Sequence, residues 1–474
     1  MRTMRTMRTI QGREPRRIAF LSEHASPAAL RGGVDAGGQN VYVDEVSRHL
    51  ARLGYAVDVF TRRDSPELPD VLEWAPGVRI VHLEAGPAAY VFKDELWPHM
   101  PAFRDAFSRF ARRDGARYDL LHGNFWMSGW VAVELGARMD VPVAQIFHAT
   151  GLTKRRHQGA ADTSPAGRIG VERAIVRRAD RLIAQCPSER SELIADYGAD
   201  PAKIAVIPSA VNTSVFRPMP REEARRRIGL ETDGPVVVYV GRMLPRKDVR
   251  NIVRALALLV RERGVLVTLL LVGGESAEPD AAATPEIGVL RALAAELGIT
   301  EYVRFAGKRQ ADELRYYYCA GDVAVTTPWY EPFGLTPLEG MACGRPVIGA
   351  AVGGIPFTIA DGETGYLVPP RDPAALAERL CALLADVALR ERMGLAARVR
   401  VEREFTWPLV AERTAALYEA LLTGRTEPGS TTGAGRVPDR VTVVGAEAVG
   451  YTRAVEAAAS VPGGVPGGVP GEGA

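Results

Sequence analysis

The stretch EPFGLTPLEGMACG occupies residues 331–344 and places two carboxylates eight positions apart. Pro337 suits the first turn of a helix, where its missing N–H group costs nothing. The residues at 334–335 then lie just before that helix, and outward-pointing amides at a helix start bind anions. Glu339 falls in the first turns of the helix, and its two acceptor oxygens suit the two hydroxyls of a ribose. Glu331 precedes the helix and can meet a second polyol, so the stretch predicts a nucleotide-sugar site.

Buried parallel strands are predicted throughout the chain around this stretch, because short apolar runs alternate with amphipathic helical segments. The first series, within 17–208, comprises RIAFLS, AVDVFT, RIVHLE, DLLHGN, PVAQIFH, RLIAQC and KIAVIP. The second series, within 236–352, comprises VVVYVGR, VTLLLVGG, VRFAG, DVAVTTP and PVIGAAV. Helices are expected between the strands, for example at 41–53 and 166–179. This alternation is typical of doubly wound α/β sheets, and two series predict two Rossmann-like domains.

The polar, proline-marked segment around 212–220 separates the two series. We therefore expect an N-terminal Rossmann-like domain at 17–213 and a C-terminal one at 214–406. Residues 1–16 begin with MRT repeated three times and are expected to form a disordered basic tail. Residues 423–474 are rich in Gly and Pro, which cannot build a core, so they are also expected to be disordered.

Composition and charge indicate an ordinary globular protein, with 47% hydrophobic and 24% charged residues among 474. The formal net charge of +2 gives no indication of nucleic-acid binding as the main role. The four cysteines are widely spaced and form no C-x-x-C pair, which favours reduced thiols in a cytoplasmic protein. No apolar run approaches the roughly 18 residues of a membrane span, and the N-terminus has no apolar signal region.

The segment EPFGLTPLEG resembles the E-x7-E motif of retaining glycosyltransferases with the GT-B fold, and especially of family 4. The resemblance runs from about residue 18 to residue 422. It implies two Rossmann-like domains that face a central cleft, joined by a helix at 407–422 that crosses back to the first domain. It also implies transfer of a hexosyl group from a nucleoside-diphosphate sugar to a hydroxyl acceptor with retention. A UDP-sugar is favoured, although users of GDP-mannose share the motif.

The donor side of this expected cleft involves two basic loops. VGRMLPRKD places Arg242 and Lys247 after a buried strand, at the carboxyl end where such sheets bind ligands. An Arg fork and a Lys point charge together suit a diphosphate, and the resemblance assigns both to the leaving group. In the family, the backbone around Lys308 and Arg309 meets the nucleobase. The predicted donor-binding residues are therefore Gly37, Gly38, Arg242, Lys247, Lys308, Arg309, Phe333, Gly334, Leu335 and Glu339.

The first domain contributes a glycine loop and a histidine to this prediction. In DAGGQNVYV, Gly37 and Gly38 precede a helix, so the backbone can approach an anion closely. The loop resembles the phosphate-facing loop of sucrose-phosphate synthases and of the N-acetylglucosaminyltransferases that act on inositol phosphate in mycothiol synthesis. His148 ends the run PVAQIFH and aligns with the family histidine near the donor sugar. His148 and Glu331 are therefore the predicted catalytic residues.

The acceptor side is predicted from weaker signals. LEAGPAAYVFKDELWPHMPAF resembles the acceptor-phosphate region of both relatives, in which Lys93 matches a phosphate-binding lysine. Arg168 aligns with another phosphate ligand, and Lys154 is a further candidate. Phe125 and Ala149 stand where the inositol-phosphate enzyme has Tyr and Thr, so two hydroxyl contacts are missing. A sugar phosphate or a related polyol phosphate is therefore an alternative to inositol phosphate.

No metal or other cofactor is expected, because the chain has no Asp-x-Asp clamp and no His pair spaced as zinc ligands. The charge of the diphosphate must then be met by Arg242, Lys247 and the two helix starts. The family implies attack by the acceptor hydroxyl on the face that the diphosphate leaves. Three alternatives remain open at this point: a nucleotide-sugar epimerase, an α-glucan phosphorylase and a non-catalytic relative that binds nucleotide sugars. A phosphorylase is disfavoured because no lysine lies in a recognisable pyridoxal-phosphate context. An epimerase would not need an acceptor region.

Overall fold

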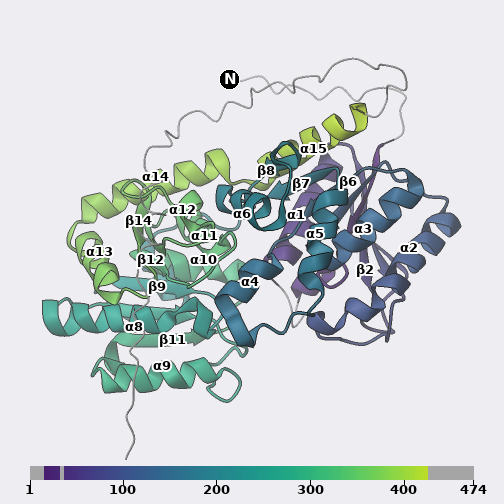
Figure 1. Ribbon diagram of the computed structural model, residues 1–474. Coiled ribbons are helices and arrows are strands. Elements are labelled where there is room, and N and C mark those ends of the chain that lie inside the picture. Colours follow the sequence, from purple (N-terminus) through teal and green to yellow (C-terminus); the bar gives the residue numbers. More distant parts are fainter. Residues whose placement is uncertain (1–14, 32–36, 425–474) are drawn as a thin grey trace, which may run out of the picture. The chain divides into compact units, whose positions relative to one another are not determined.

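The computed structural model describes residues 15–31 and 37–424, and Figure 1 shows how their helices and strands are arranged. The predicted tails at 1–16 and 423–474 lie outside this part of the chain except for two residues each, as does the glycine loop before Gly37. Within the described residues, no helix combines the length and the apolar composition that crossing a membrane requires. All four cysteines lie there as free thiols.

The first domain is built on an eight-stranded sheet with the order β3-β4-β2-β1-β5-β6-β7-β8. Neighbouring strands are parallel except for the antiparallel edge pair of β3 and β4. The strands are β1 (Arg17–Leu21), β2 (Ala56–Arg62), β3 (Val71–Ala75), β4 (Val78–Leu83), β5 (Leu120–Asn124), β6 (Val143–Ile146), β7 (Arg181–Ala184) and β8 (Ile204–Val206).

Helices cover both faces of this sheet (Figure 1). They are α1 (Gly38–Arg52), α2 (Met100–Asp114), α3 (Phe125–Met139), α4 (Gly151–Gln158), α5 (Arg168–Arg178) and α6 (Pro187–Tyr197). Alternate residues of β1 enter opposite cores, as the period of two in a strand requires. Ile18 and Phe20 pack in the core that contains α1, whereas Ala19 and Leu21 pack in the core that contains α2 and α3.

The second domain has a six-stranded parallel sheet with the order β11-β10-β9-β12-β13-β14. Its strands are β9 (Val236–Val240), β10 (Thr268–Val272), β11 (Val303–Gly307), β12 (Val323–Thr326), β13 (Val347–Ala350) and β14 (Gly365–Val368). Its helices are α7 (Arg221–Arg227), α8 (Val249–Ala257), α9 (Pro285–Glu296), α10 (Ala311–Ala320), α11 (Leu335–Ala342), α12 (Ile355–Thr358), α13 (Pro373–Ala385) and α14 (Val387–Glu404). The predicted fold class of two Rossmann-like α/β domains is confirmed.

A last helix, α15 (Trp407–Thr423), follows α14 and packs on the first domain rather than the second. Trp407 and Tyr418 are buried in the same core as Ile18 and helix α1. In contrast, Val401 of α14 is buried in a core of the second domain. The chain thus returns to the first domain between these two helices, as Figure 1 shows.

Each apolar run of the sequence contains one strand of the sheets, but β3 and β14 were not anticipated. β3 is an edge strand that pairs only with β4, and all five of its residues are at least partly exposed. β14 has four residues, of which Tyr366 and Leu367 are only partly buried. Neither strand is a continuous buried run, so the hydrophobic pattern that predicts central parallel strands does not detect them.

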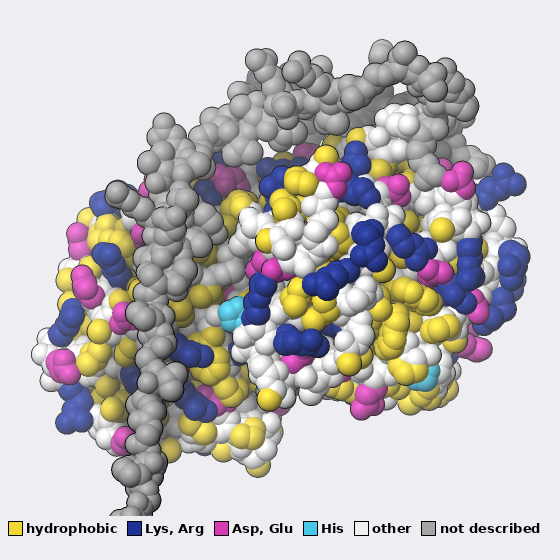
Figure 2. All heavy atoms as spheres, viewed as in Figure 1, with side chains coloured by type: hydrophobic (Ala, Val, Ile, Leu, Met, Phe, Trp, Pro, Cys, Tyr) yellow, Lys and Arg dark blue, Asp and Glu magenta, His cyan; other side chains and the backbone are white. Residues whose placement is uncertain are grey.

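Charged side chains are distributed unevenly over the surface seen in Figure 2. Lys and Arg side chains are prominent across the first domain, whereas basic and acidic side chains are interspersed on the second.

The start of α6 connects the two domains. Ser188 Oγ donates to the Gly353 carbonyl at 3.0 Å, and Cys186 Sγ donates to the Pro332 carbonyl at 3.5 Å. Glu189, on the same turn, is 6% exposed and accepts a hydrogen bond of 2.6 Å from the backbone amide of Gln185. Burial raises the pKa of Glu189 to about 7, and the Gln185 amide opposes this shift.

This raised pKa predicts pH-dependent stability. The folded state holds the Glu189 proton more tightly than the unfolded state does, so protonation of Glu189 stabilises the folded state. This contribution to the free energy of unfolding is complete below about pH 4 and is lost as pH rises to about 7. We expect the free energy of unfolding of the wild-type protein to fall, relative to E189Q, by about 2–3 kcal/mol between pH 5 and pH 8. Denaturant unfolding of both proteins across this range measures the difference, and parallel curves would contradict it.

Candidate functional site

The candidate site lies at the carboxyl ends of the central strands of both sheets. In the first sheet the strand order changes direction between β1 and β5, and in the second between β9 and β12. Open α/β sheets bind ligands at such points. The starts of α1 and α11 meet there, because a Cβ atom added to Gly38 would lie 3.3 Å from Leu335 Cδ1. The structure therefore brings together the two helix starts that the sequence marks as anion sites.

The start of α11 depends on glycine. Gly334 precedes the helix with φ +89°, in a region that favours glycine over other residues. Gly353 packs so closely on the preceding segment that an added Cβ would lie 1.8 Å from the Glu331 carbonyl oxygen. Leu335, expected just outside the helix, is its first residue, and Pro337 is the third. Helix boundaries routinely differ by such a margin.

The central polar contact of the donor side is an ion pair between Lys247 Nζ and Glu331 Oε2. The two side chains are 12% and 17% exposed, so the pair is largely shielded from water. Burial acts against ionisation of Glu331, but Lys247, Arg246 and Arg242 outweigh it and hold the pKa of this carboxyl below its usual value. Burial also lowers the pKa of Lys247, although the charge of Glu331 opposes that shift.

Arg242 and Arg246 add positive charge around this pair. Arg242 is exposed, and its backbone carbonyl accepts a hydrogen bond of 3.0 Å from Tyr239. The Arg246 carbonyl accepts a hydrogen bond of 2.9 Å from the backbone amide of Trp329, which fixes this loop to the end of β12. Arg246 was not among the predicted residues, although it directly precedes Lys247 in the same basic loop.

Glu339 lies one turn into α11 and has a different partner. Tyr318 of α10 donates to Glu339 Oε2 at 2.8 Å, so the carboxylate is oriented before any ligand binds. Burial raises the pKa of Glu339, and the Tyr318 hydroxyl and the charge of Lys247 oppose the shift. No signal in the sequence distinguishes Tyr318 from the two tyrosines that precede it, because its role depends on the packing of α10 against α11.

The remaining predicted donor residues are more dispersed. The Phe333 side chain is 4% exposed and packs against Phe405, so only its backbone can face a ligand. Arg309 donates from Nε to the Tyr317 hydroxyl at 2.6 Å and from Nη1 to the Ala277 carbonyl at 2.7 Å. The Lys308 amide donates to the Ser276 carbonyl at 2.8 Å. Lys308 and Arg309 follow β11, and Arg242 follows β9, so all three lie at the carboxyl ends of strands in the parallel sheet.

His148 follows β6 in the first domain and has an uncommon backbone conformation, with φ +58°. Its Nε2 lies 3.2 Å from Asn124 Oδ1, at the end of the neighbouring strand β5. The Tyr42 ring of α1 meets the His148 ring edge-on, with centroids 5.0 Å apart. Burial lowers the pKa of His148 to about 3, so the imidazole is neutral at physiological pH. Strained non-glycine residues of this kind are concentrated at functional sites.

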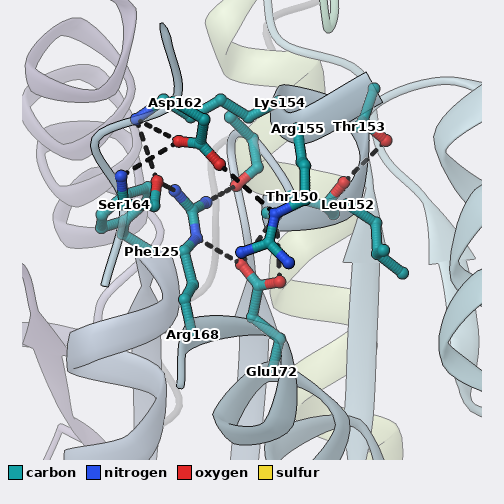
Figure 3. Close-up of polar contacts among 12 residues, drawn as sticks. Phe125, Thr150, Leu152, Thr153, Lys154, Arg155, Asp162, Ser164, Arg168 and Glu172 are labelled. Carbon is teal, nitrogen blue, oxygen red and sulfur yellow. Dashed lines mark hydrogen bonds and ion pairs between the residues drawn. The ribbon is translucent and has the colours of Figure 1, made fainter. Parts of the chain in front are cut away.

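The predicted acceptor residues Lys154, Arg168 and Phe125 lie close together (Figure 3). Lys154 Nζ and Arg168 Nη1 both donate to Ser164 Oγ, at 2.9 and 3.2 Å. The Arg168 guanidinium lies over the Phe125 ring, 4.9 Å from its centroid. Phe125 also has a positive φ, +74°.

Carboxylates accompany these cations. Lys154 Nζ is 3.3 Å from Asp94 Oδ2 and 3.1 Å from Asp162 Oδ1. Burial opposes ionisation of Asp94, but the Thr163 hydroxyl and the Lys154 ammonium hold its pKa below the usual value. Lys93 is next to Asp94 and adds to this effect. The predicted acceptor residues Lys154 and Arg168 therefore carry their positive charge in ion pairs.

A small pocket lies where residues of the two domains meet. It is lined by the turn after β6, the start of α6 and the segment before α11, with Ala149, Thr150, Ser188, Glu189, Glu192, Tyr330, Pro332 and Gly353. His157 of α4 stacks on Tyr330 with centroids 4.6 Å apart, which joins the domains at its edge. In the described part of the chain, no group of three His, Cys, Asp or Glu side chains is arranged as metal ligands would be.

Comparisons with known proteins agree with this architecture. Residues 36–215 match the family model described as Glycosyltransferase Family 4, and residues 220–400 match the model described as Glycosyl transferases group 1. A D-inositol 3-phosphate glycosyltransferase of Streptomyces bingchenggensis is 39% identical over 419 residues, covering 87% of this chain and 91% of the relative. The same enzyme of Kineococcus radiotolerans is 40% identical over 423 residues, covering 86% and 96%.

Solved structures lead to the same family. Sucrose-phosphate synthase from Thermosynechococcus elongatus is 36% identical and superposes with a TM-score of 0.76, covering 86% of this chain and all of that one. Anabaena HepE in complex with UDP and glucose is 19% identical with a TM-score of 0.66, covering 85% of this chain and all of that one, and supports the fold alone. The chain therefore belongs to family 4 of the GT-B glycosyltransferases.

Proposed function

We propose that this protein transfers a hexosyl group, with retention, from a nucleoside-diphosphate sugar to a hydroxyl of a phosphorylated polyol or sugar. The observation that carries the proposal is the meeting of two helix starts, at Gly38 and Leu335, beside the ion pair of Lys247 and Glu331. A diphosphate has the charge that two helix starts and a basic loop would stabilise. A UDP-sugar is the favoured donor because of the resemblance to family 4.

The donor would bind along the start of α11. Glu339 would accept hydrogen bonds from the ribose hydroxyls, with Tyr318 orienting the carboxylate from the other side. Lys247 and Arg242 would bind the diphosphate, and Glu331 would accept from hydroxyls of the sugar. The ion pair keeps the Glu331 carboxylate ionised and acceptor-only, which suits recognition of hydroxyl donors.

The chemistry would proceed on one face of the sugar. The acceptor oxygen forms the new bond to the anomeric carbon while the bond from that carbon to the diphosphate oxygen breaks. The acceptor proton passes to the departing diphosphate oxygen. The positive charges around Lys247 and the two helix starts stabilise the developing negative charge. The neutral His148 imidazole would position the reacting hydroxyls without adding a charge of its own.

The acceptor class follows from the basic residues and the relatives. Two of the relatives are named as glycosyltransferases of D-inositol 3-phosphate, and the third is named as a synthase of sucrose phosphate. Lys93 and Lys154 are the proposed contacts of the acceptor phosphate, with Arg168 supporting them through Ser164. Phe125 cannot supply a hydroxyl to the phosphate, which favours a phosphorylated acceptor other than inositol phosphate.

The two carboxylates of α11 and its preceding loop should have separable roles. We expect E339Q to weaken nucleoside diphosphate binding about 10- to 100-fold, because a hydrogen bond to a charged group contributes about 1.5–3 kcal/mol. E331Q should lower kcat more than it weakens binding, because it acts on the sugar and leaves Lys247 unpaired. Isothermal titration with UDP and initial rates with UDP-glucose and UDP-N-acetylglucosamine measure both effects.

The control for these variants is E402Q, which removes an exposed carboxylate paired with Arg398 on α14. This variant should bind and turn over as the wild-type protein does. Wild-type UDP affinity in E339Q would overturn the ribose assignment, and a wild-type rate in E331Q would remove Glu331 from the site.

Transfer should not require a divalent cation. The side chains of Arg242, Arg246 and Lys247 and the two helix starts provide positive charge for the leaving diphosphate. We expect EDTA to change the rate by less than about twofold, whereas R242A should lower it by at least about tenfold. A loss of activity in EDTA that added Mg²⁺ or Mn²⁺ restores would contradict this expectation.

The phosphate contact is tested by K154A. We expect about a tenfold higher KM for a phosphorylated acceptor, with the donor KM unchanged, because a charge-assisted contact to the phosphate is lost. Rates with fructose 6-phosphate and inositol 1-phosphate should be compared with those of fructose and myo-inositol. K203A is the matched control, since this lysine donates to the backbone carbonyls of Arg177 and Ala179, away from the predicted acceptor residues. Equal losses with phosphorylated and unphosphorylated acceptors would refute the assignment.

A further inference from the structure

The turn that carries His148 requires an explanation for its stability. His148 has φ +58°, and the next residue closes a tight turn in which the Ala149 amide donates to the Phe147 carbonyl at 2.6 Å. A non-glycine residue in this region is strained and persists only where surrounding contacts impose it. The turn continues into α4 at Gly151, so the contacts of the helix start determine where His148 lies.

Glu172 of α5 holds this helix start. Its side chain is fully buried, and both carboxylate oxygens lie 3.0 Å from the Gly151 amide nitrogen, which donates to them. The fit is close, since a Cβ added to Gly151 would lie 2.9 Å from Glu172 Oε2. The tyrosine hydroxyl of Tyr197 donates to Glu172 Oε2 at 2.6 Å and accepts from the Leu152 amide at 2.9 Å. One carboxylate thereby fixes two successive residues of the turn.

Arg168 links the same carboxylate to the residue next to His148. Its side chain is 2% exposed, its Nε donates to Glu172 Oε1 at 2.8 Å, and its Nη2 donates to the Ala149 carbonyl at 2.7 Å. Figure 3 shows the guanidinium between the Glu172 carboxylate and the Ser164 side of the site. The Glu172 carboxylate, the Arg168 guanidinium and the Tyr197 hydroxyl together hold the turn from Ala149 to Leu152.

We propose that Glu172 is a positioning residue for catalysis, acting with Arg168 and Tyr197 to hold His148 in its strained conformation. This inference rests on the proposed function, in which His148 lies at the reacting centre. It also gives Arg168 a role through the Ala149 carbonyl rather than in direct contact with the acceptor. A glutamine at 172 replaces the carboxylate only in part. Wherever its oxygen lies, its NH₂ group takes the place of an oxygen that accepts from the Gly151 amide and from either Arg168 Nε or the Tyr197 hydroxyl.

The protein contains a matched control with the same chemistry. Asp58 of β2 is buried and accepts from Arg79 Nε and Nη2, both at 2.8 Å, and from the Tyr118 hydroxyl at 2.7 Å. This second group of an arginine, a carboxylate and a tyrosine lies in the same domain but touches neither His148 nor its turn. D58N therefore measures the effect of losing a buried, arginine-paired carboxylate that does not contact the turn of His148.

The kinetic test compares E172Q with D58N, at a temperature where both are folded. E172Q should lower kcat about 100-fold with the donor KM within about twofold of wild type, because a small displacement of a reacting group costs about that factor. D58N should lower the melting temperature but keep kcat. In the H148A background, E172Q should cause little further loss, since the residue it positions is already gone. A wild-type kcat in E172Q, or the same loss with and without His148, would overturn the proposal.

Hydrogen–deuterium exchange separates this inference from the proposed function. The Gly151 and Leu152 amides should exchange more slowly in the wild type than in E172Q, while D58N leaves their exchange unchanged. If no donor is turned over by the wild-type protein, the proposed function fails, and the exchange result still decides whether Glu172 holds the turn. Unchanged exchange at these amides in E172Q would overturn the positioning role whatever the kinetics.

Discussion

The ion pair between Lys247 and Glu331 is the contact on which the donor side depends. It joins the loop after β9 to the segment before α11, two parts of the chain that are 84 residues apart. Because both side chains are largely buried, each needs the other, and removing one would leave an unpaired charge. The pair thus holds a carboxylate and a basic loop next to the helix start at Leu335, where the start of α1 also arrives.

The predicted donor and acceptor residues differ in how far their positive charges are paired with carboxylates. Around Lys247, positive groups outnumber Glu331, and their combined effect lowers the pKa of that carboxyl against the cost of burial. On the acceptor side, Lys154 already lies between Asp94 and Asp162. Under the proposed function, an anionic acceptor would compete with these carboxylates, whereas a diphosphate would meet an excess of positive charge.

Parallel strands and helix starts were predictable because they depend on local patterns. The apolar runs located twelve of the fourteen strands in the described part of the chain, and the glycine and proline framework of 331–344 located α11. The edge strand β3 was missed because Glu73 interrupts its apolar residues, and β14 because only three apolar residues follow Gly365. Tyr318 and Glu172 were missed because each lies on a helix and gains its role from a neighbour distant in sequence. Asn124 had a usable signal, since it is a polar residue at the end of a buried run.

The sequence by itself determined the fold class, the family and the two helix starts that face an anion, since periodicity, glycine and proline act over a few residues. Only the tertiary structure decided which partners surround those residues. Lys247 pairs with Glu331, and His148 contacts Tyr42 of α1 and Asn124 of β5. Arg168 is buried and donates to the Ala149 carbonyl next to His148. The physical reason is that burial, pKa and hydrogen-bond partners depend on the packing of elements that are far apart along the chain.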